Sequence, residues 1–169
     1  EVKELGKRLF PAEIISPEID NFIRERKLDN SEKGILEAVR FVQNEVRYLG
    51  IVNGIHSHKP HQPEDVLKNS FGDCKDKSYL LVSILRKIGI EAWPAYVSTF
   101  ELNYTDDHLP SPFVFNHIIV KFRWNNKDFW IDPTISQQGG SLQYLSNPGY
   151  RKALVIDDKS NTLVTLYLL

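Results

Sequence analysis

Methionine is absent from this sequence of 169 residues, and cysteine occurs once, as Cys74. A single cysteine excludes an intrachain disulfide bond and a zinc site made of several thiolates. The formal net charge is only −1, so no large field of one sign exists, and neither nucleic acid nor an acidic membrane surface is an expected partner. Long apolar runs are also absent, which excludes a helix that spans a bilayer, and no signal peptide is visible. Because position 1 is glutamate, we expect the chain to be a fragment of a longer protein.

The composition is that of a folded globular protein. Hydrophobic residues make up 41% of the chain and charged residues 25%, which argues against a disordered or fibrous protein. The length suits a single domain over residues 1–169. Within this domain we expect a core over about residues 30–135 and a C-terminal β extension over 136–169.

Hydrophobic spacing predicts helices first and strands later. Residues 3–50 follow a helical pattern, with Asn30 and Ser31 as cap candidates of one helix and two or three short helices before it. The next long helix is expected over 74–88, with one apolar stripe facing the core. Strands are predicted over 90–99, 116–123, 127–132, 152–156 and 162–168, and loops over 50–72 and 100–115, with a short amphipathic piece at Pro63–Lys68 and a strand edge or bulge at Pro94. This order indicates an α+β fold.

The lone cysteine stands at the predicted start of the long helix, just after Gly72 and Asp73. The free N–H groups and the dipole at a helix N-terminus favour a thiolate over a thiol. The same N–H groups can hold an oxyanion that develops on a substrate carbonyl. Asp76, in the first turn, is expected to cap the helix. The alternative for Cys74 is an inert buried residue of the core.

A hairpin is predicted around Asn125-Asn126, and its register selects a base for the cysteine. With an even-numbered loop, one face of the hairpin carries the core residues Ile118, Val120, Phe122, Phe129 and Ile131, and the other carries His117, Ile119, Trp130 and Asp132. His117 would then lie opposite Thr134 and diagonal to Asp132. At Cβ separations of roughly 6–8 Å, a carboxylate reaches an imidazole nitrogen. The alternative is a solvated histidine and an aspartate that caps a turn.

Cysteine, histidine and carboxylate together form the triad of a thiol enzyme, with Cys74 as nucleophile, His117 as base and Asp132 as the residue that orients the base. The remaining histidines favour other roles. His56, His58 and His61 lie in a loop rich in glycine and proline and could form a metal site, but their spacing does not ensure convergent geometry, so no metal is expected. His108 lies in a polar loop and is expected to be solvated.

These motifs resemble the transglutaminase-like superfamily, within the larger papain-like group of thiol enzymes. The resemblance covers about Val46–Thr134. It rests on the Phe-Gly-Asp-Cys-Lys-Asp-Lys-Ser segment at 71–78, the Leu-Arg-x-x-Gly-Ile-x-Ala segment at 85–92, the Phe-Asn-His segment at 115–117 and the Trp-Ile-Asp-Pro-Thr segment at 130–134. Segments at 46–50 and 59–63 also resemble a bacterial subgroup whose members carry a domain of unknown function before this core.

The resemblance implies a papain-like core and a cysteine-dependent acyl transfer through a thioester, with hydrolysis of a peptide-like amide or transfer to an amine. A binding module that keeps this fold without turnover is the alternative. The resemblance also implies a peptide or protein substrate, flanking domains, and an exported, periplasmic or cell-envelope protein. No cofactor is implied, and calcium dependence is not carried over, because the calcium-binding loops of the animal enzymes have no counterpart here. The side-chain oxyanion donor stays unassigned, with Tyr48, Asn53 and Gln62 as candidates, and Trp130 is expected to pack beside His117, to line the substrate groove or to fill the core.

Overall fold

The computed structural model describes residues 1–12, 14–50, 59–100, 111–159 and 162–166. Parts of the two predicted loops lie outside these ranges. So do the oxyanion candidate Asn53 and the histidines His56, His58 and His108. In the part of the chain that is described, no helix is long and apolar enough to cross a membrane.

The chain begins with three helices: α1 (Val2–Leu9), α2 (Pro17–Arg26) and α3 (Glu32–Asn44). The side chain of Ser16 accepts a hydrogen bond from Ile19 N and begins α2, where Pro17 takes the first helical position. Ser31 caps α3 in the same way, accepting from Gly34 N. The predicted cap of α3 and the two short helices before it are therefore confirmed.

A small parallel pair of strands, which the sequence pattern did not predict, leads into the nucleophile segment. Strand β1 (Arg47–Tyr48) pairs with β2 (Phe71–Gly72), so that Tyr48 lies beside Gly72. Between them runs α4 (Pro63–Asn69), which confirms the short amphipathic piece. Each strand has only two residues, too few for a period of two to be visible in the sequence.

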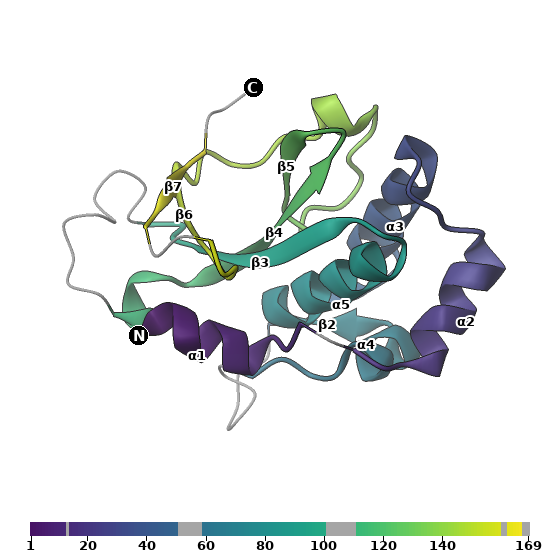
Figure 1. Ribbon diagram of the computed structural model, residues 1–169, viewed down its shortest axis with the longest axis horizontal. Helices are drawn as coiled ribbons and strands as arrows, with labels where there is room; N and C mark the ends of the chain where they lie inside the picture. Colours follow the sequence, from purple (N-terminus) through teal and green to yellow (C-terminus); the bar gives the residue numbers. More distant parts are fainter. Residues whose placement is uncertain (13, 51–58, 101–110, 160–161, 167–169) are drawn as a thin grey trace.

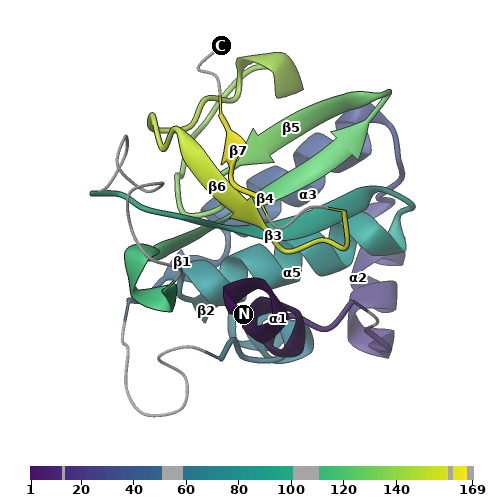
Figure 2. The same cartoon turned by 60° about the vertical axis from the view of Figure 1, so that its left-hand side comes forward.

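The long helix α5 (Cys74–Lys87) begins at the cysteine, as predicted. The single apolar stripe, however, was too narrow a prediction, because every residue from Lys75 to Leu85 is buried. The helix packs against α3, α4, β3 and β4 together, and a helix surrounded in this way has no solvent face. Figures 1 and 2 show it running beneath the sheet, with α3 alongside.

Five antiparallel strands form the main sheet in the order β5-β4-β3-β6-β7. They are β3 (Glu91–Val97), β4 (His117–Trp124), β5 (Lys127–Ile131), β6 (Lys152–Val155) and β7 (Val164–Thr165), with the 3₁₀ turns η3 (Pro112–Val114) and η4 (Leu142–Tyr144) between them. Helices on one side and this curled antiparallel sheet on the other give an α+β fold (Figure 1).

The prediction of a strand edge or a bulge at Pro94 is wrong, because β3 lies inside the sheet and its pairing with β4 is continuous from Glu91 to Val97. The ladder between β3 and β6 ends at Ala95↔Val155, one residue after Pro94. The carbonyl of Pro94 faces β6 and accepts from Ile156 N, and the proline nitrogen, which has no hydrogen to donate, faces the same side. The proline thus lies where one ladder ends, although the strand itself is not an edge.

The hairpin register is confirmed. Val120 pairs with Ile131 and Phe122 with Phe129, and the two-residue loop has positive φ at Asn125 (49°) and Asn126 (60°), as a type I′ turn requires. Ile118, Val120, Phe122 and Ile131 are buried, and Phe129 packs against the main core. The opposite face is also covered, because Ile119 is fully buried in a second cluster with residues of β3 and β6. The β4–β5 ladder starts at Val120↔Ile131, so the expected pairing of His117 with Thr134 is not formed.

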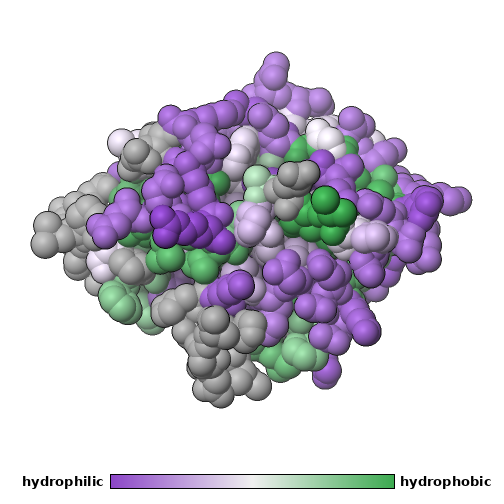
Figure 3. Space-filling model, turned by 60° about the horizontal axis from the view of Figure 1, so that its bottom comes forward, coloured by the Kyte–Doolittle hydropathy of each residue, from purple (hydrophilic) through white to green (hydrophobic). Residues whose placement is uncertain are grey.

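The face that Figure 3 shows is mainly hydrophilic. On this face, hydrophobic residues form separate patches among hydrophilic ones. Large exposed hydrophobic side chains include Tyr48, Leu49 and Phe71, which all belong to the β1–β2 region just before α5.

Candidate active site

The start of α5 is fixed by a reciprocal pair of aspartates. Asp73 accepts hydrogen bonds from the N–H groups of Lys75 and Asp76, while Asp76 accepts from Asp73 N at 3.0 Å. This capping box satisfies the N–H groups of Asp73, Lys75 and Asp76. The N-cap residue is thus Asp73, whereas this role was predicted for Asp76, which takes part in the box from the third helical position. Asp76 also accepts from His61 N at 2.8 Å.

Cys74 is the first residue of this helix and is partly exposed. No acceptor for its N–H group occurs among the described residues. Two of the N–H groups that the sequence offered for an oxyanion, those of Lys75 and Asp76, are occupied by Asp73. The N–H of Cys74 itself is the candidate that is left for this role.

Gly72 is required for this entry into the helix. A Cβ atom at position 72 would lie 2.5 Å from the Asp76 Cβ atom, closer than non-bonded carbon atoms approach each other. The absence of a side chain at Gly72 therefore lets the capping box close directly before the cysteine.

A buried serine ties the nucleophile helix to the strand that carries the histidine. Ser78 lies one turn after Cys74 and donates from Oγ to the Ile118 carbonyl at 3.0 Å. Ile118 is the neighbour of His117 on β4. This hydrogen bond sets the position of β4 along α5, and with it the position of the imidazole relative to the thiol.

The histidine and the aspartate meet as the hairpin register predicts. The Nε2 atom of His117 lies 2.8 Å from Oδ2 of Asp132. The side chains are 12% and 1% exposed, so the carboxylate is closed off from solvent while one edge of the imidazole is not. Since Nε2 faces Asp132, the Nδ1 atom is the one left for Cys74.

The electrostatics of the histidine follow from its two neighbours. Burial lowers the pKa of His117, but hydrogen bonds with Asp132 and Cys74, and the charges of both, outweigh burial and raise the pKa to about 9. Near neutral pH the imidazole therefore carries a proton. The contribution of Cys74 to this pKa also means that the thiol of α5 and the ring of β4 lie close together.

Asp132 is held by more donors than the sequence suggested. Its Oδ1 atom accepts from the N–H of Thr134 at 2.8 Å and from its hydroxyl at 2.7 Å. Its Oδ2 atom accepts from the hydroxyl of Tyr150 at 2.6 Å, in addition to His117. Burial raises the pKa of Asp132, but hydrogen bonds from His117, Tyr150 and Thr134 outweigh it and hold the pKa below its ordinary value. The aspartate is therefore a carboxylate.

The backbone of the aspartate is anchored from α3. Gln43, which is 3% exposed, donates from Nε2 to the Asp132 carbonyl at 3.0 Å and to Gln138 Oε1 at 2.7 Å. Lys77 lies nearby, 1% exposed, with Nζ 2.5 Å from the Val46 carbonyl just after α3. Burial lowers the pKa of Lys77 to about 8, against the opposing charge of Asp132.

The three candidates for the side-chain oxyanion donor differ in their positions. Tyr48 is near the site: burial raises its pKa, and the charges of Cys74, Asp73 and Asp132 raise it further. Gln62 stands exposed at the start of α4 and makes no side-chain cap, and Asn53 lies outside the described residues.

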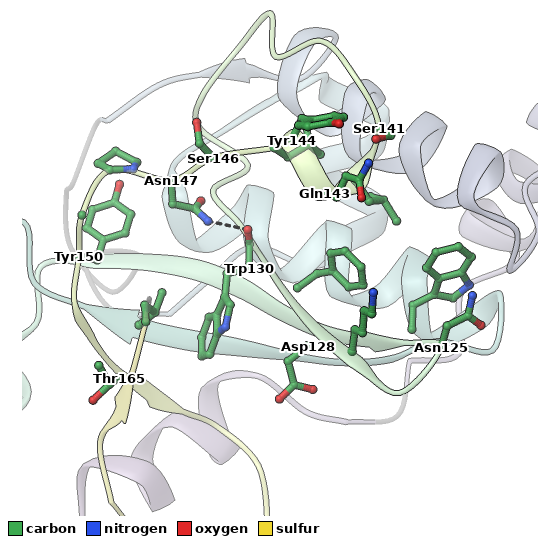
Figure 4. Close-up of a pocket in the computed structure, with 18 of the residues that line it drawn as sticks. Asn125, Asp128, Trp130, Ser141, Gln143, Tyr144, Ser146, Asn147, Tyr150 and Thr165 are labelled. Atoms are coloured by element: carbon green, nitrogen blue, oxygen red, sulfur yellow. Dashed lines mark hydrogen bonds between the residues drawn. The ribbon is translucent and has the colours of Figure 1, made fainter. Parts of the chain in front are cut away.

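Trp130 packs with the second cluster, which contains Ile119 and Tyr150. It also lines a pocket between β5 and residues 141–151 that includes neither Cys74 nor His117 (Figure 4). Of the roles considered for Trp130, core filling is the one its contacts support.

Sequence reasoning missed Tyr150 and Gln43. Neither belongs to a motif or a periodic stretch that marks it, and both act through contacts that exist only in the folded chain. Within the described ranges, no group of three or more His, Cys, Asp and Glu side chains is arranged to hold a metal ion.

Comparison with known proteins places the fold and the family. The sequence matches the transglutaminase-like superfamily over residues 21–139, and no curated protein matches it. The structure is similar to that of a candidate protease from Parabacteroides distasonis, with a TM-score of 0.69 at 18% identity, over 98% of this chain and 30% of that one. A candidate cysteine protease from Cytophaga hutchinsonii gives a TM-score of 0.48 at 16% identity, over 79% of this chain and 36% of that one.

The chain thus spans about a third of the length of either structure. The match to the family covers well over half of the sequence and includes Cys74, His117 and Asp132. The chain belongs to the transglutaminase-like superfamily.

Proposed function

We propose that the domain is a thiol enzyme that transfers acyl groups from peptide-like amides, with Cys74 as nucleophile, His117 as acid and base, and Asp132 as the residue that orients the imidazole. The observation that carries the proposal is the position of His117: Nε2 lies 2.8 Å from the buried carboxylate of Asp132, and Cys74, at the start of α5, is close enough to the ring to raise its pKa.

The reaction begins with the thiolate of Cys74, paired with the protonated imidazole of His117. Sulfur attacks the carbonyl carbon of the amide and forms a C–S bond, and the N–H of Cys74 stabilises the oxyanion. The imidazolium gives its proton to the leaving nitrogen, the C–N bond breaks, and an acyl thioester remains on Cys74.

In the second half the neutral imidazole takes a proton from the attacking molecule. Water as the attacking molecule gives a carboxylic acid, and an amine gives a new amide. Either attack expels the Cys74 thiolate and restores the ion pair with His117. We favour water and a peptide or protein substrate, and flanking domains of a longer protein are part of the proposal.

The single cysteine makes the first test unambiguous, because iodoacetamide can label only Cys74. A thiolate–imidazolium pair gives fast alkylation that stays nearly constant from pH 8 down to about pH 6. His117→Gln should slow the reaction at pH 6 by roughly tenfold or more, and restore the pH dependence of an ordinary thiol. Equal, slow rates in both proteins would contradict the proposal and favour a binding module without turnover.

A second assay identifies the acceptor. The protein is incubated with a peptide mixture and a labelled primary amine, and the products are read by mass spectrometry. New peptide termini show hydrolysis, and labelled peptides show transfer to the amine. Cys74→Ala is the control. It should remain folded, because loss of one thiol at a helix start leaves only a small void, about 1 kcal/mol in stability, and it should give neither product.

A further inference from the structure

The hydroxyl of Tyr150 is directed at the same carboxylate oxygen that holds the histidine. It donates to Asp132 Oδ2 at 2.6 Å, in a buried position 18 residues along the chain from the aspartate. Tyr150 is 6% exposed, and the centre of its ring lies 5.7 Å from the centre of the His117 ring. It therefore contacts both members of the pair.

With Tyr150 in place, every acceptor position of Asp132 is used. A carboxylate offers about four lone-pair positions, and Asp132 accepts from Thr134 N, Thr134 Oγ1, His117 Nε2 and Tyr150 Oη. Thr134 fixes only Oδ1. The hydroxyl of Tyr150 is the second donor to Oδ2, so it determines how that oxygen is turned toward the imidazole.

The segment that carries Tyr150 is fastened on two sides. Asn147 donates to the Trp130 carbonyl on β5 at 2.5 Å, at the end of the pocket where Tyr150 stands (Figure 4). Beyond Tyr150, β6 pairs with β3, with Ala153 beside Val97. Val97 in turn pairs with His117. The anchored segment thus spans from β5 to β6 and passes the end of β4 that bears the histidine.

We propose that Tyr150 is a positioning residue of the active site, whose hydroxyl holds the Asp132 carboxylate so that Oδ2 faces Nε2 of His117. This inference rests on the proposed function. Tyr150 lies beyond the residues that match the family, 21–139. The segment before β6 therefore supplies a part of the site that the matched region does not contain.

The hydroxyl of Tyr150 also weakens the electrostatic effect of the Asp132 carboxylate on the imidazole of His117. It shares the negative charge of Oδ2, so its removal leaves more of that charge for His117 and favours the imidazolium. Among the described residues, other charged and titratable groups around the pair include Cys74 and Lys77 on α5, Tyr48 on β1 and Tyr96 on β3. None of these is altered when Tyr150 loses its hydroxyl.

The test is Tyr150→Phe, which keeps the ring and removes one oxygen. The ring signals of His117 are followed by NMR from pH 5 to pH 10.5 and assigned with His117→Gln. We expect the midpoint of the His117 titration to rise by roughly half a unit to one unit in Tyr150→Phe. Tyr144→Phe is the matched control, since Tyr144 lies in the same segment with its side chain exposed, and its midpoint should equal that of the wild type.

A midpoint that is unchanged in Tyr150→Phe, in a protein whose Cys74 still reacts fast with iodoacetamide at pH 6, would overturn the inference and leave the proposed function standing. Slow alkylation of the wild type would overturn the proposed function itself. Should Tyr150→Phe fail to fold, the NMR signal of the Tyr150 ring carbon that bears the hydroxyl is followed in the wild type. This signal must shift over the pH range in which His117 titrates. A signal without such a shift would refute the inference that Tyr150 and His117 share Oδ2 of Asp132.

Discussion

Removing the hydroxyl of Ser78 tests whether α5 and β4 are fastened together where the reacting groups meet. In Ser78→Ala, the bond from Oγ to the Ile118 carbonyl is lost, and Ser78 has no exposed surface through which water could replace it. A buried neutral hydrogen bond contributes about 1 kcal/mol net, and a carbonyl left without its donor costs about 1–3 kcal/mol. We therefore expect a loss of about 1–2 kcal/mol in the free energy of unfolding.

The same substitution should slow the chemistry of Cys74. Ser78 lies one turn from Cys74, and its acceptor lies one residue from His117, so the bond sets the distance between thiol and imidazole. A misplacement of about 1 Å at reacting groups can cost on the order of 100-fold in rate. We expect the alkylation rate of Cys74 at pH 6 to fall by roughly three- to tenfold, and product formation on peptides by more.

Ser83→Ala is the matched control on the same helix. Ser83 is 1% exposed, but its hydroxyl donates to the Tyr79 carbonyl inside α5 at 2.6 Å and links no second element. Urea unfolding gives the stability of each variant, and iodoacetamide gives the reactivity of Cys74. Equal alkylation rates in the two variants and the wild type would show that the Ser78 bond does not position the site.

Two further outcomes follow from His117 and Gly72. The folded-state pKa of His117, about 9, lies above its ordinary value of 6.5, so its protonation stabilises the fold fully below pH 6.5, and this contribution is lost as the pH rises through 9. The loss is at most about 3 kcal/mol. It is measured by urea unfolding at pH 6 and pH 9.5, as the decline in the free energy of unfolding of the wild type minus the decline in His117→Gln. Lys77, whose titration acts in the opposite direction, is present in both proteins, so the subtraction removes its contribution. A difference of zero would show that the ion pairs of His117 are absent in solution. Gly72→Ala should cost about 1–3 kcal/mol, because its Cβ would lie 2.5 Å from the Asp76 Cβ, and thermal unfolding at the wild-type midpoint would contradict that contact.

The parts of the site that the sequence predicted depend on local signals. The turn at Asn125-Asn126 fixes the hairpin register. The alternation of apolar residues in the two strands agrees with only one register, because a shift by one residue would turn these side chains to the opposite face. His117 and Asp132 can therefore be paired from the sequence alone. The start of α5 is predictable as well, because Gly72 allows a sharp entry and the apolar spacing from Cys74 onward is helical. The N-cap role of Asp73 was not predicted.

The parts that the sequence did not predict depend on contacts between distant segments. Lys77 reads as a solvated residue of a helix, yet it is buried because the end of α3 supplies carbonyl acceptors to its Nζ atom. Tyr150 donates to Asp132 only because β6 joins the sheet next to β3. No local propensity encodes such contacts, and a two-residue pair such as β1–β2 is too short to leave a pattern.

The sequence separation between contacting residues of the site also bears on the order in which the site forms during folding. His117 and Asp132 are 15 positions apart on one hairpin, and hairpins form within about 1–10 μs because little chain must be closed. The bond from Gln43 to the Asp132 carbonyl spans 89 positions, and such long-range contacts form later, since their loops cost more entropy. The imidazole and its carboxylate are thus expected to meet early in folding, whereas the contact that fixes the aspartate to α3 waits until the sheet closes on the helices.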